Sequence, residues 1–172
     1  MPEGTNQPRN DLETGLTPGD QLDLRTWLRL LTCANMVEGE VRARLRTEFD
    51  ITIARFDLLA QLDRAGLTDD RGLTMGELSR RLMVTNGNVT SLIDRLVGEE
   101  LVMRRPDPAD RRTHIIELTP GGRHAFKKMS EAHASWISGL FDGIDRKSLE
   151  ALYGNLARLK ASLTADNKIG DD

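Results

Sequence analysis

The sequence has little of several residue types that would define a class of protein. Its 172 residues include one cysteine, Cys33, so no disulfide can form within the chain, and this composition suits a reducing compartment such as the cytoplasm. No stretch approaches the ~18–20 apolar residues of a membrane-spanning helix, and we expect no signal peptide in residues 1–20. The histidines and the cysteine show no metal-ligand spacing, so we expect no metal and no other cofactor.

The chain also lacks an overall excess of positive charge, because its net charge is −3. The distribution of charge is uneven. Residues 71–128 carry 11 Lys/Arg and 7 Asp/Glu, whereas the remainder carries 13 and 20. The middle of the chain is therefore basic and its flanks are acidic. This segregation favours a negatively charged partner for the middle segment, and chance clustering is the alternative.

Hydrophobic periodicity predicts a helix-rich chain that begins with a long helix. From about residue 21 to 48, apolar side chains recur every three or four positions and form one stripe. A helix of ~28 residues is ~42 Å long, so we expect part of it to meet another subunit; an ordinary core helix with an exposed end is the alternative. Residues 1–20 are interpreted as a mobile tail. A second helix, 52–65, should stop at Gly66, and Leu73 could add a short strand.

Two short helices joined by a turn are predicted next. Thr74 and Glu77 have the spacing of a capping box, and the helix that they start should run to about Met83. Thr85 should cap the following helix. The apolar stripe of that helix consists of Val89, Leu92, Ile93 and Leu96. This arrangement predicts a helix-turn-helix, whose second helix presents its outer face to a groove of DNA.

The outer face of the second helix carries amide, hydroxyl and guanidinium groups. These residues are Asn86, Asn88, Thr90, Ser91 and Arg95. Amides and hydroxyls lower helix propensity, so their number here suggests a use. Asparagine can bridge adenine N6 and N7, threonine methyls pack on thymine, and arginine pairs with guanine. Each residue taken alone also fits a capping or solvated role.

Strand-like runs at 101–105 and 112–118 flank a Pro/Asp turn, so we predict a β-hairpin. The charged residues near its tip are Arg104, Arg105, Asp107, Asp110, Arg111 and Arg112. An arginine on a protruding hairpin can enter a narrow minor groove, and an adjacent carboxylate can orient its guanidinium. A surface hairpin of mixed charge is the alternative, which the position directly after a helix-turn-helix disfavours.

Two further helices are predicted after the hairpin. Thr119-Pro120 is typical of a helix start, and this helix should extend to about Phe141. The last helix, from about Arg146, has a leucine seam suited to helix–helix packing. The seam consists of Leu149, Leu152, Leu156, Leu159 and Leu163.

These motifs together resemble the MarR family of winged helix-turn-helix regulators over about residues 22–163. The most specific part is Asp110-Arg111-Arg112 followed by Leu118-Thr119 and Gly122, which is similar to the family pattern D-x-R…LT-x-x-G. The segment TNGNVTSLIDRL at 85–96 is similar to the family's recognition helix. The resemblance implies a mainly α fold, a winged helix-turn-helix with long N- and C-terminal dimerisation helices and one β-hairpin wing.

The resemblance also implies a division of the chain and a function. The parts are a tail (1–20), an N-terminal dimerisation helix (21–50), a DNA-binding lobe (51–122), C-terminal dimerisation helices (123–165) and a polar tail (166–172). Such a homodimer binds a pseudo-palindromic double-stranded operator and usually represses transcription. The DNA-binding residues implied are Asn86, Asn88, Thr90, Ser91 and Arg95 at the major groove and Asp110, Arg111 and Arg112 on the wing.

Members of the family commonly lose DNA affinity when a small molecule, often an aromatic acid, enters the cleft between the dimer helices and the DNA-binding lobe. Peroxide-sensing members have a cysteine in the first helix where this chain has Leu28, so the resemblance does not extend to thiol sensing. Trp27, Asp57 and Arg104 resemble three residues of urate-responsive members, but Leu92 replaces the fourth, an arginine.

An arginine cluster near the end of the first helix bears on the effector. It consists of Arg42, Arg44 and Arg46, with Arg55 following. The stretches LRLLTCANMVEGEVRARL and MGELSRRLMVTNGNVT resemble the branch that responds to aromatic-acid CoA thioesters, and a phosphate-bearing ligand would suit these arginines. The alternative is a solvated helix face in which they pair with Glu38, Glu40 and Glu48.

Two other functions remain to be weighed against a DNA-binding regulator. Winged helices also serve as protein-docking modules, which would enrich no palindromic DNA. An enzyme is not expected, because the sequence contains no nucleophile–base pair, phosphate-cradling glycine loop or metal constellation.

Overall fold

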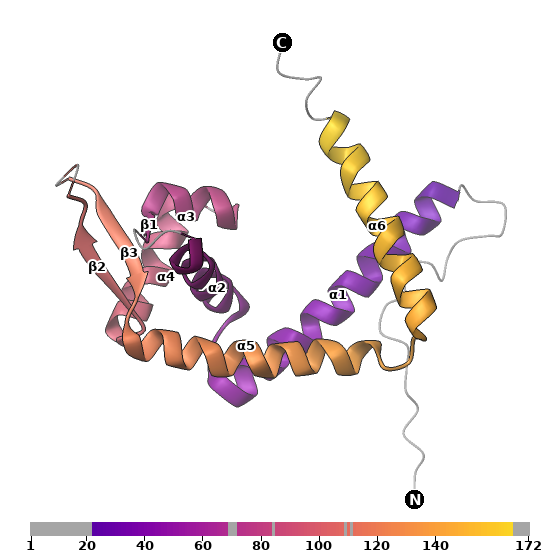
Figure 1. The fold of residues 1–172 in the computed structure, drawn as a ribbon, viewed down its shortest axis with the longest axis horizontal. Helices are drawn as coiled ribbons and strands as arrows, with labels where there is room; N and C mark the ends of the chain where they lie inside the picture. Colours follow the sequence, from indigo (N-terminus) through magenta and orange to yellow (C-terminus); the bar gives the residue numbers. More distant parts are fainter. Residues whose placement is uncertain (1–21, 69–71, 84, 109, 111, 167–172) are drawn as a thin grey trace, which may run out of the picture. The chain divides into compact units, whose positions relative to one another are not determined.

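The structure is a computed structural model that describes residues 22–68, 72–83, 85–108, 110 and 112–166. These residues form six helices and three strands (Figure 1): α1 (Leu22–Phe49), α2 (Ile53–Thr68), β1 (Leu73–Thr74), α3 (Met75–Leu82), α4 (Asn86–Gly98), β2 (Val102–Pro106), β3 (His114–Leu118), α5 (Pro120–Phe141) and α6 (Arg146–Asp166). The chain divides into two compact units between His133 and Ala134. Within the described ranges, none of the helices has the length and apolar character needed to cross a membrane.

The order of the elements confirms the mainly α-helical winged helix-turn-helix fold predicted from the sequence. One boundary was wrong, because α2 continues past Gly66 to Thr68. The Nη1 atom of Arg123 lies 3.2 Å from the point that a Cβ at Gly66 would occupy. Glycine therefore makes room for a guanidinium over the last turn of α2, where a cation is favourable beside the helix C-terminus. The predicted tail at 1–20 and most of the polar end lie outside the described residues.

The three strands form an antiparallel sheet in the order β1-β3-β2. Leu73 pairs with Ile116, and Val102 pairs with Leu118. Because β3 is the central strand, both Ile115 and Ile116 are fully buried. The short strand suggested at Leu73 is confirmed as β1, and it depends on Gly72, which has a φ of 77°.

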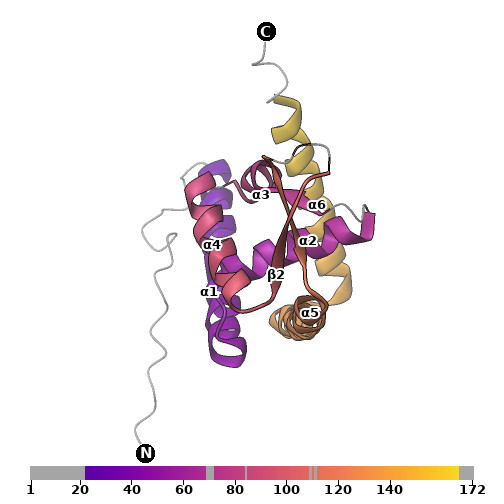
Figure 2. The same cartoon turned by 90° about the vertical axis from the view of Figure 1, so that its left-hand side faces the viewer.

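The core of the first unit lies where α2, α3 and α4 pack against the sheet, and α1 packs on α2 (Figure 2). Its largest fully buried side chains are Leu45, Ile51, Leu58, Leu59, Leu78, Val89, Ile93, Leu96, Val102, Ile115, Ile116 and Leu118. Burial of each such side chain contributes roughly 1.5–3 kcal/mol. The core therefore fixes the helix-turn-helix and the base of the hairpin as one body.

The second unit, described by itself, contains the end of α5 and the whole of α6. The leucine seam of α6 is exposed in the single chain: Leu152, Leu156 and Leu159 are 40%, 39% and 40% exposed. Leucine seams of this kind are stable when they pack against another helix.

Candidate nucleic-acid interface

Local hydrogen bonds cap both ends of helix α3. The Glu77 N–H donates to Thr74 Oγ1 over 3.2 Å, and the Thr74 N–H donates to Glu77 Oε2 over 2.8 Å. The predicted capping box is therefore confirmed. At the other end, the Met83 N–H donates to the Arg80 carbonyl, and Met83 itself adopts the left-handed conformation. This turn redirects the chain into α4.

Helix α4 is capped by Thr85, whose hydroxyl oxygen accepts from the Asn88 N–H over 3.5 Å. Its stripe is buried at Val89, Ile93 and Leu96 and half-buried at Leu92. The residues predicted to read DNA lie on the opposite side, where Asn88, Thr90, Ser91 and Arg95 are all exposed. Asn86 is the first helical residue, and its side chain lies outside the described part of the structure.

The tip of the hairpin is held by Asp110. Its carboxylate accepts from the Arg112 N–H over 2.9 Å and from the Thr113 hydroxyl over 3.0 Å. The bond from the Arg112 N–H, followed by that from Thr113, lowers the pKa of the Asp110 carboxyl below its ordinary value. Asp110 thus orders the backbone from which the exposed Arg112 side chain projects. The neighbouring Arg111 is outside the described residues.

Ion pairs connect the hairpin with α4 and join its two strands. Arg104 Nη2 on β2 lies 2.5 Å from Asp94 Oδ1 on α4. Arg105 Nε lies 3.1 Å from Glu117 Oε1 on β3. These pairs are partly exposed, so each contributes about 1 kcal/mol or less to stability. Their main effect is geometric, because the Arg104–Asp94 pair connects the hairpin to α4 and the Arg105–Glu117 pair holds its two strands together.

A third ion pair lies at the C-terminal end of α4. The side chain of Arg55, on α2, turns inward and pairs with Glu99, the C-cap residue of α4. Arg55 is only 8% exposed. Burial lowers its pKa, the nearby Arg95 lowers it further, and Asp50 opposes the shift. The sequence groups Arg55 with the arginines of α1; the structure instead places it as a connection between α2 and α4.

Comparisons with known proteins agree with this geometry. The sequence profile of the MarR family matches residues 51–114. A crystal structure of a MarR family transcriptional regulator from Silicibacter pomeroyi is 30% identical, with a TM-score of 0.69, over 86% of this chain and 99% of that one. This chain belongs to the MarR family. It is accordingly a DNA-binding transcriptional regulator of the winged helix type.

Other relatives of this MarR-family chain agree. The transcriptional activatory protein BadR of Rhodopseudomonas palustris is 32% identical over 111 residues, or 64% of this chain. That alignment spans 62% of the length of BadR. The crystal structure of the apo form of wild-type MarR from E. coli is 26% identical, with a TM-score of 0.67, over 76% of this chain and 94% of that one.

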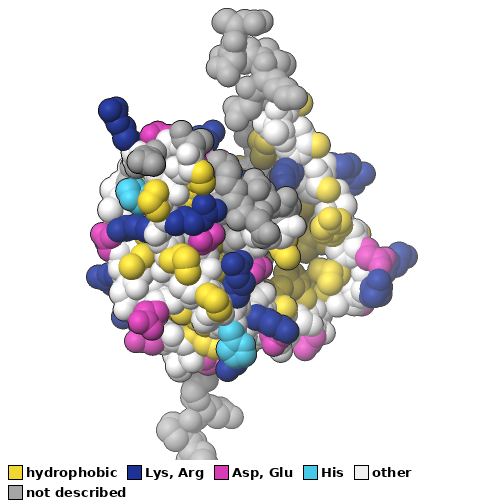
Figure 3. All heavy atoms as spheres, turned by 60° about the vertical axis from the view of Figure 1, so that its left-hand side comes forward, with side chains coloured by type: hydrophobic (Ala, Val, Ile, Leu, Met, Phe, Trp, Pro, Cys, Tyr) yellow, Lys and Arg dark blue, Asp and Glu magenta, His cyan; other side chains and the backbone are white. Residues whose placement is uncertain are grey.

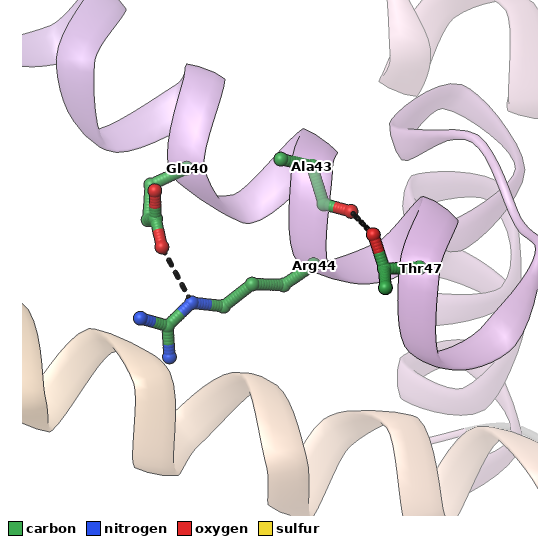
Figure 4. Close-up of polar contacts among 4 residues, drawn as sticks. All are labelled: Glu40, Ala43, Arg44 and Thr47. Carbon is green, nitrogen blue, oxygen red and sulfur yellow. Dashed lines mark hydrogen bonds and ion pairs between the residues drawn. The ribbon is translucent and has the colours of Figure 1, made fainter.

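The arginines of α1 that were predicted to bind an effector mostly have acidic neighbours. Arg42 pairs with Glu38, and Arg44 Nε lies 2.7 Å from Glu40 Oε1 one turn earlier (Figure 4). Arg46 is exposed near the end of the helix. Each of the two pairs is the arrangement expected of a solvated helix face. Trp27, also predicted to bind an effector, is 55% exposed on α1.

A cleft of about 550 Å³ lies within the first unit of this MarR-family chain, among α2, α3 and α5. Its lining combines aromatic and charged residues: Phe56, Asp57, Arg64, Arg81, Phe126 and His133. The Phe56 ring centre is 5.6 Å from that of Phe126 and 5.0 Å from that of His133. Burial raises the pKa of the Asp57 carboxyl, and His133 opposes this shift.

The cleft contains one of the predicted effector residues, Asp57; Trp27, the α1 arginines and Arg104 do not line it. Sequence reasoning missed Arg64 and Arg81, which do line it. Neither arginine has a local signal of such a role, because each occupies an ordinary polar position of its own helix. Only the packing of α2 against α3 brings them to the same cleft.

Proposed function

We propose that this MarR-family regulator acts in the cytoplasm as a homodimer that represses transcription from a pseudo-palindromic operator until a small aromatic ligand releases it. The observation that carries the proposal is the Arg104–Asp94 pair. It fixes an arginine-tipped hairpin beside a helix face of amides and hydroxyls, so one body presents groups for the major groove and for the minor groove.

Exposed apolar surface on the outer helices supports the dimer. Besides the leucines of α6, α1 exposes Leu24, Trp27 and Met36 at 44%, 55% and 55%. Such surface is unfavourable in water, and a second copy would bury it. A two-fold dimer would then hold two α4 helices about one turn of DNA, ~34 Å, apart. Two weakly basic lobes at a fixed spacing would bind a palindrome more tightly than one.

Arg112→Ala tests the assignment of the hairpin. We expect it to weaken binding to a duplex enriched by the wild-type protein by about 1–3 kcal/mol and to reduce the dependence of affinity on salt. Arg146→Ala, which removes an exposed arginine on α6, is the matched control and should bind like wild type. Equal affinities of the two variants, measured by fluorescence anisotropy, would refute the role of the hairpin.

The effector is proposed to be an aromatic acid or its CoA thioester. The aromatic rings of the cleft suit an aryl group, and the arginines in its lining suit a carboxylate or phosphate. Arg42, Arg44 and Arg46 would attract the phosphates of a CoA moiety, with Trp27, Asp57 and Arg104 as further candidate contacts. An aromatic acyl-CoA should then release the duplex at lower concentration than the free acid. Equal release by both would remove the role given to the α1 arginines.

Activation is a second candidate for the sign of regulation, because the relative BadR is named as an activatory protein. A reporter gene behind the enriched duplex decides between the two: expression should rise when this chain is deleted if it represses and fall if it activates. The relatives, which are named as transcriptional regulators, do not favour the other alternative, a protein-docking module that would enrich no duplex from a random pool.

A further inference from the structure

The turn between α3 and α4 carries a large apolar side chain where the fold does not require one. Met83 has a φ of 54° and is 93% exposed. The left-handed conformation is unfavourable for a residue with a Cβ and is free of strain for glycine. The exposed thioether side chain gains no burial in the single chain. The position is therefore unfavourable for methionine on both counts.

The fold explains the backbone of Met83 but not its side chain. The Met83 N–H donates to the Arg80 carbonyl over 3.4 Å and ends α3, as a left-handed residue commonly does. Glycine would serve this turn equally well. Two other described non-glycine residues have positive φ, Asp50 at 50° and Glu100 at 58°, and both have polar side chains that suit water. Among these three, Met83 alone exposes an apolar group.

The location of Met83 suggests the use of that side chain. It lies two residues before Thr85, the cap of α4, and the N-terminal end of a recognition helix is the part that enters the major groove. On its other side, Arg80 and Arg81 are exposed on the last turn of α3, and arginines in such positions bind phosphates. On the face that Figure 3 shows, Lys and Arg side chains (dark blue) lie beside hydrophobic ones (yellow), with Asp and Glu side chains (magenta) among them.

We propose that Met83 is a further DNA-contacting residue, which packs against an apolar group of the duplex at the start of the recognition helix. The inference rests on the DNA binding of the family and on α4 as the reading helix. A duplex offers two apolar groups at this position, the thymine methyl and the deoxyribose. The unbranched, polarisable side chain of methionine adapts to either. Strained conformations persist where function maintains them, which accounts for methionine where glycine would fold better.

Variants at the positive-φ positions separate this contact from a role in folding. The probe is the duplex that the full-length wild-type protein enriches from a random-sequence pool. Met83→Gly should raise Tm by about 2–4 °C, because it relieves the backbone, and should weaken binding about fivefold. Met83→Leu should retain the wild-type affinity. Glu100→Gly is the matched control. It relieves the same left-handed backbone conformation at the C-terminal end of α4, so it should raise Tm without a change in affinity for the duplex.

Two further readouts identify the contact. The slope of log affinity against log salt should be the same for Met83→Gly and wild type, because no phosphate contact is lost. If the thymine methyl is the partner, replacing thymine by uracil at the ends of the half-sites weakens the wild type and leaves Met83→Gly unchanged; if the deoxyribose is the partner, neither protein responds.

Wild-type affinity of Met83→Gly would overturn the contact. So would a loss of affinity accompanied by a lower Tm or a smaller salt slope, because this would indicate a displaced recognition helix. Those results leave the operator proposal standing. If the wild-type protein enriches no duplex at all, the proposed function fails, and the Met83 contact fails with it.

Discussion

Alanine at position 122 should strongly destabilise the first unit, whereas alanine at the adjacent position 121 should not. A Cβ at Gly122 would lie 1.8 Å from the carbonyl oxygen of Leu101, a backbone atom. A Cβ at Gly121 would have one neighbour, Thr119 Oγ1, at 3.7 Å. Both glycines lie in the first turn of α5, so the two variants share chain position and helix propensity.

The magnitude follows from what must move. The Thr119 N–H donates to the Leu101 carbonyl over 3.1 Å, and the Thr119 hydroxyl donates to the Glu100 carbonyl over 2.6 Å. Separating the start of α5 from the α4–β2 turn to admit a methyl group would strain or break both bonds. Overpacking and two hydrogen bonds together cost about 3–5 kcal/mol. Gly121→Ala should instead gain about 0.5 kcal/mol from the lower entropy of its unfolded chain.

Urea denaturation followed by circular dichroism measures this difference. Equal m-values for the two variants would show that the same surface unfolds in each. We expect a lower midpoint for Gly122→Ala and an unchanged or higher one for Gly121→Ala. A difference in unfolding free energy below about 1 kcal/mol between the two variants would refute the close packing of α5 on the α4–β2 turn, since disrupting that packing should cost several times as much.

Three further predictions concern charged groups. Glu99→Ala leaves the buried Arg55 guanidinium without its carboxylate and should lower the free energy of unfolding, measured by urea denaturation, by about 2 kcal/mol. Arg55→Met leaves only a half-exposed carboxylate in water and should lower it by less than about 1 kcal/mol. The reverse order would contradict the inward placement of Arg55. The fold lowers the pKa of Asp110, so the contribution of this carboxylate to stability is complete above its ordinary pKa and is lost as pH falls through the lowered pKa. The Arg112 amide signal, followed by NMR, should therefore titrate at a pH below the ordinary carboxyl pKa of ~3.9. The raised pKa of Asp57 has the opposite sign: stability declines as pH rises from the ordinary value through the raised one, and Asp57→Asn should remove this decline from a series of Tm measurements.

Features of the fold that depend on nearby residues could be predicted from the sequence. The capping box of Thr74 and Glu77 was one such feature, because both of its hydrogen bonds lie within four residues. The outer helices and the hairpin were likewise defined by periodicity and turn residues. The predicted end of α2 was wrong because the environment of Gly66 depends on Arg123, which is distant in sequence. Local rules contain no information about such a neighbour.

The candidate site was predictable to the same extent. The exposed face of α4 followed from the position of its apolar stripe, and the structure brings Asn88, Thr90, Ser91 and Arg95 together there. The direction in which a charged side chain turns did not follow. In the sequence, Arg55 cannot be distinguished from the arginines of α1. Tertiary packing is what turns its side chain inward toward Glu99. For the same reason the cleft could not be predicted from local patterns.

The symmetry and stoichiometry of the bound DNA test the central proposal most directly. The wild-type chain is used to select duplexes from a random pool, and the mass of the complex is measured by analytical ultracentrifugation. We predict an inverted repeat whose half-site centres lie about 10 base pairs, or one turn, apart, with two chains on each duplex. An enriched site without two-fold symmetry, or one chain per duplex, would contradict a homodimer that reads DNA through two copies of α4 and its wing.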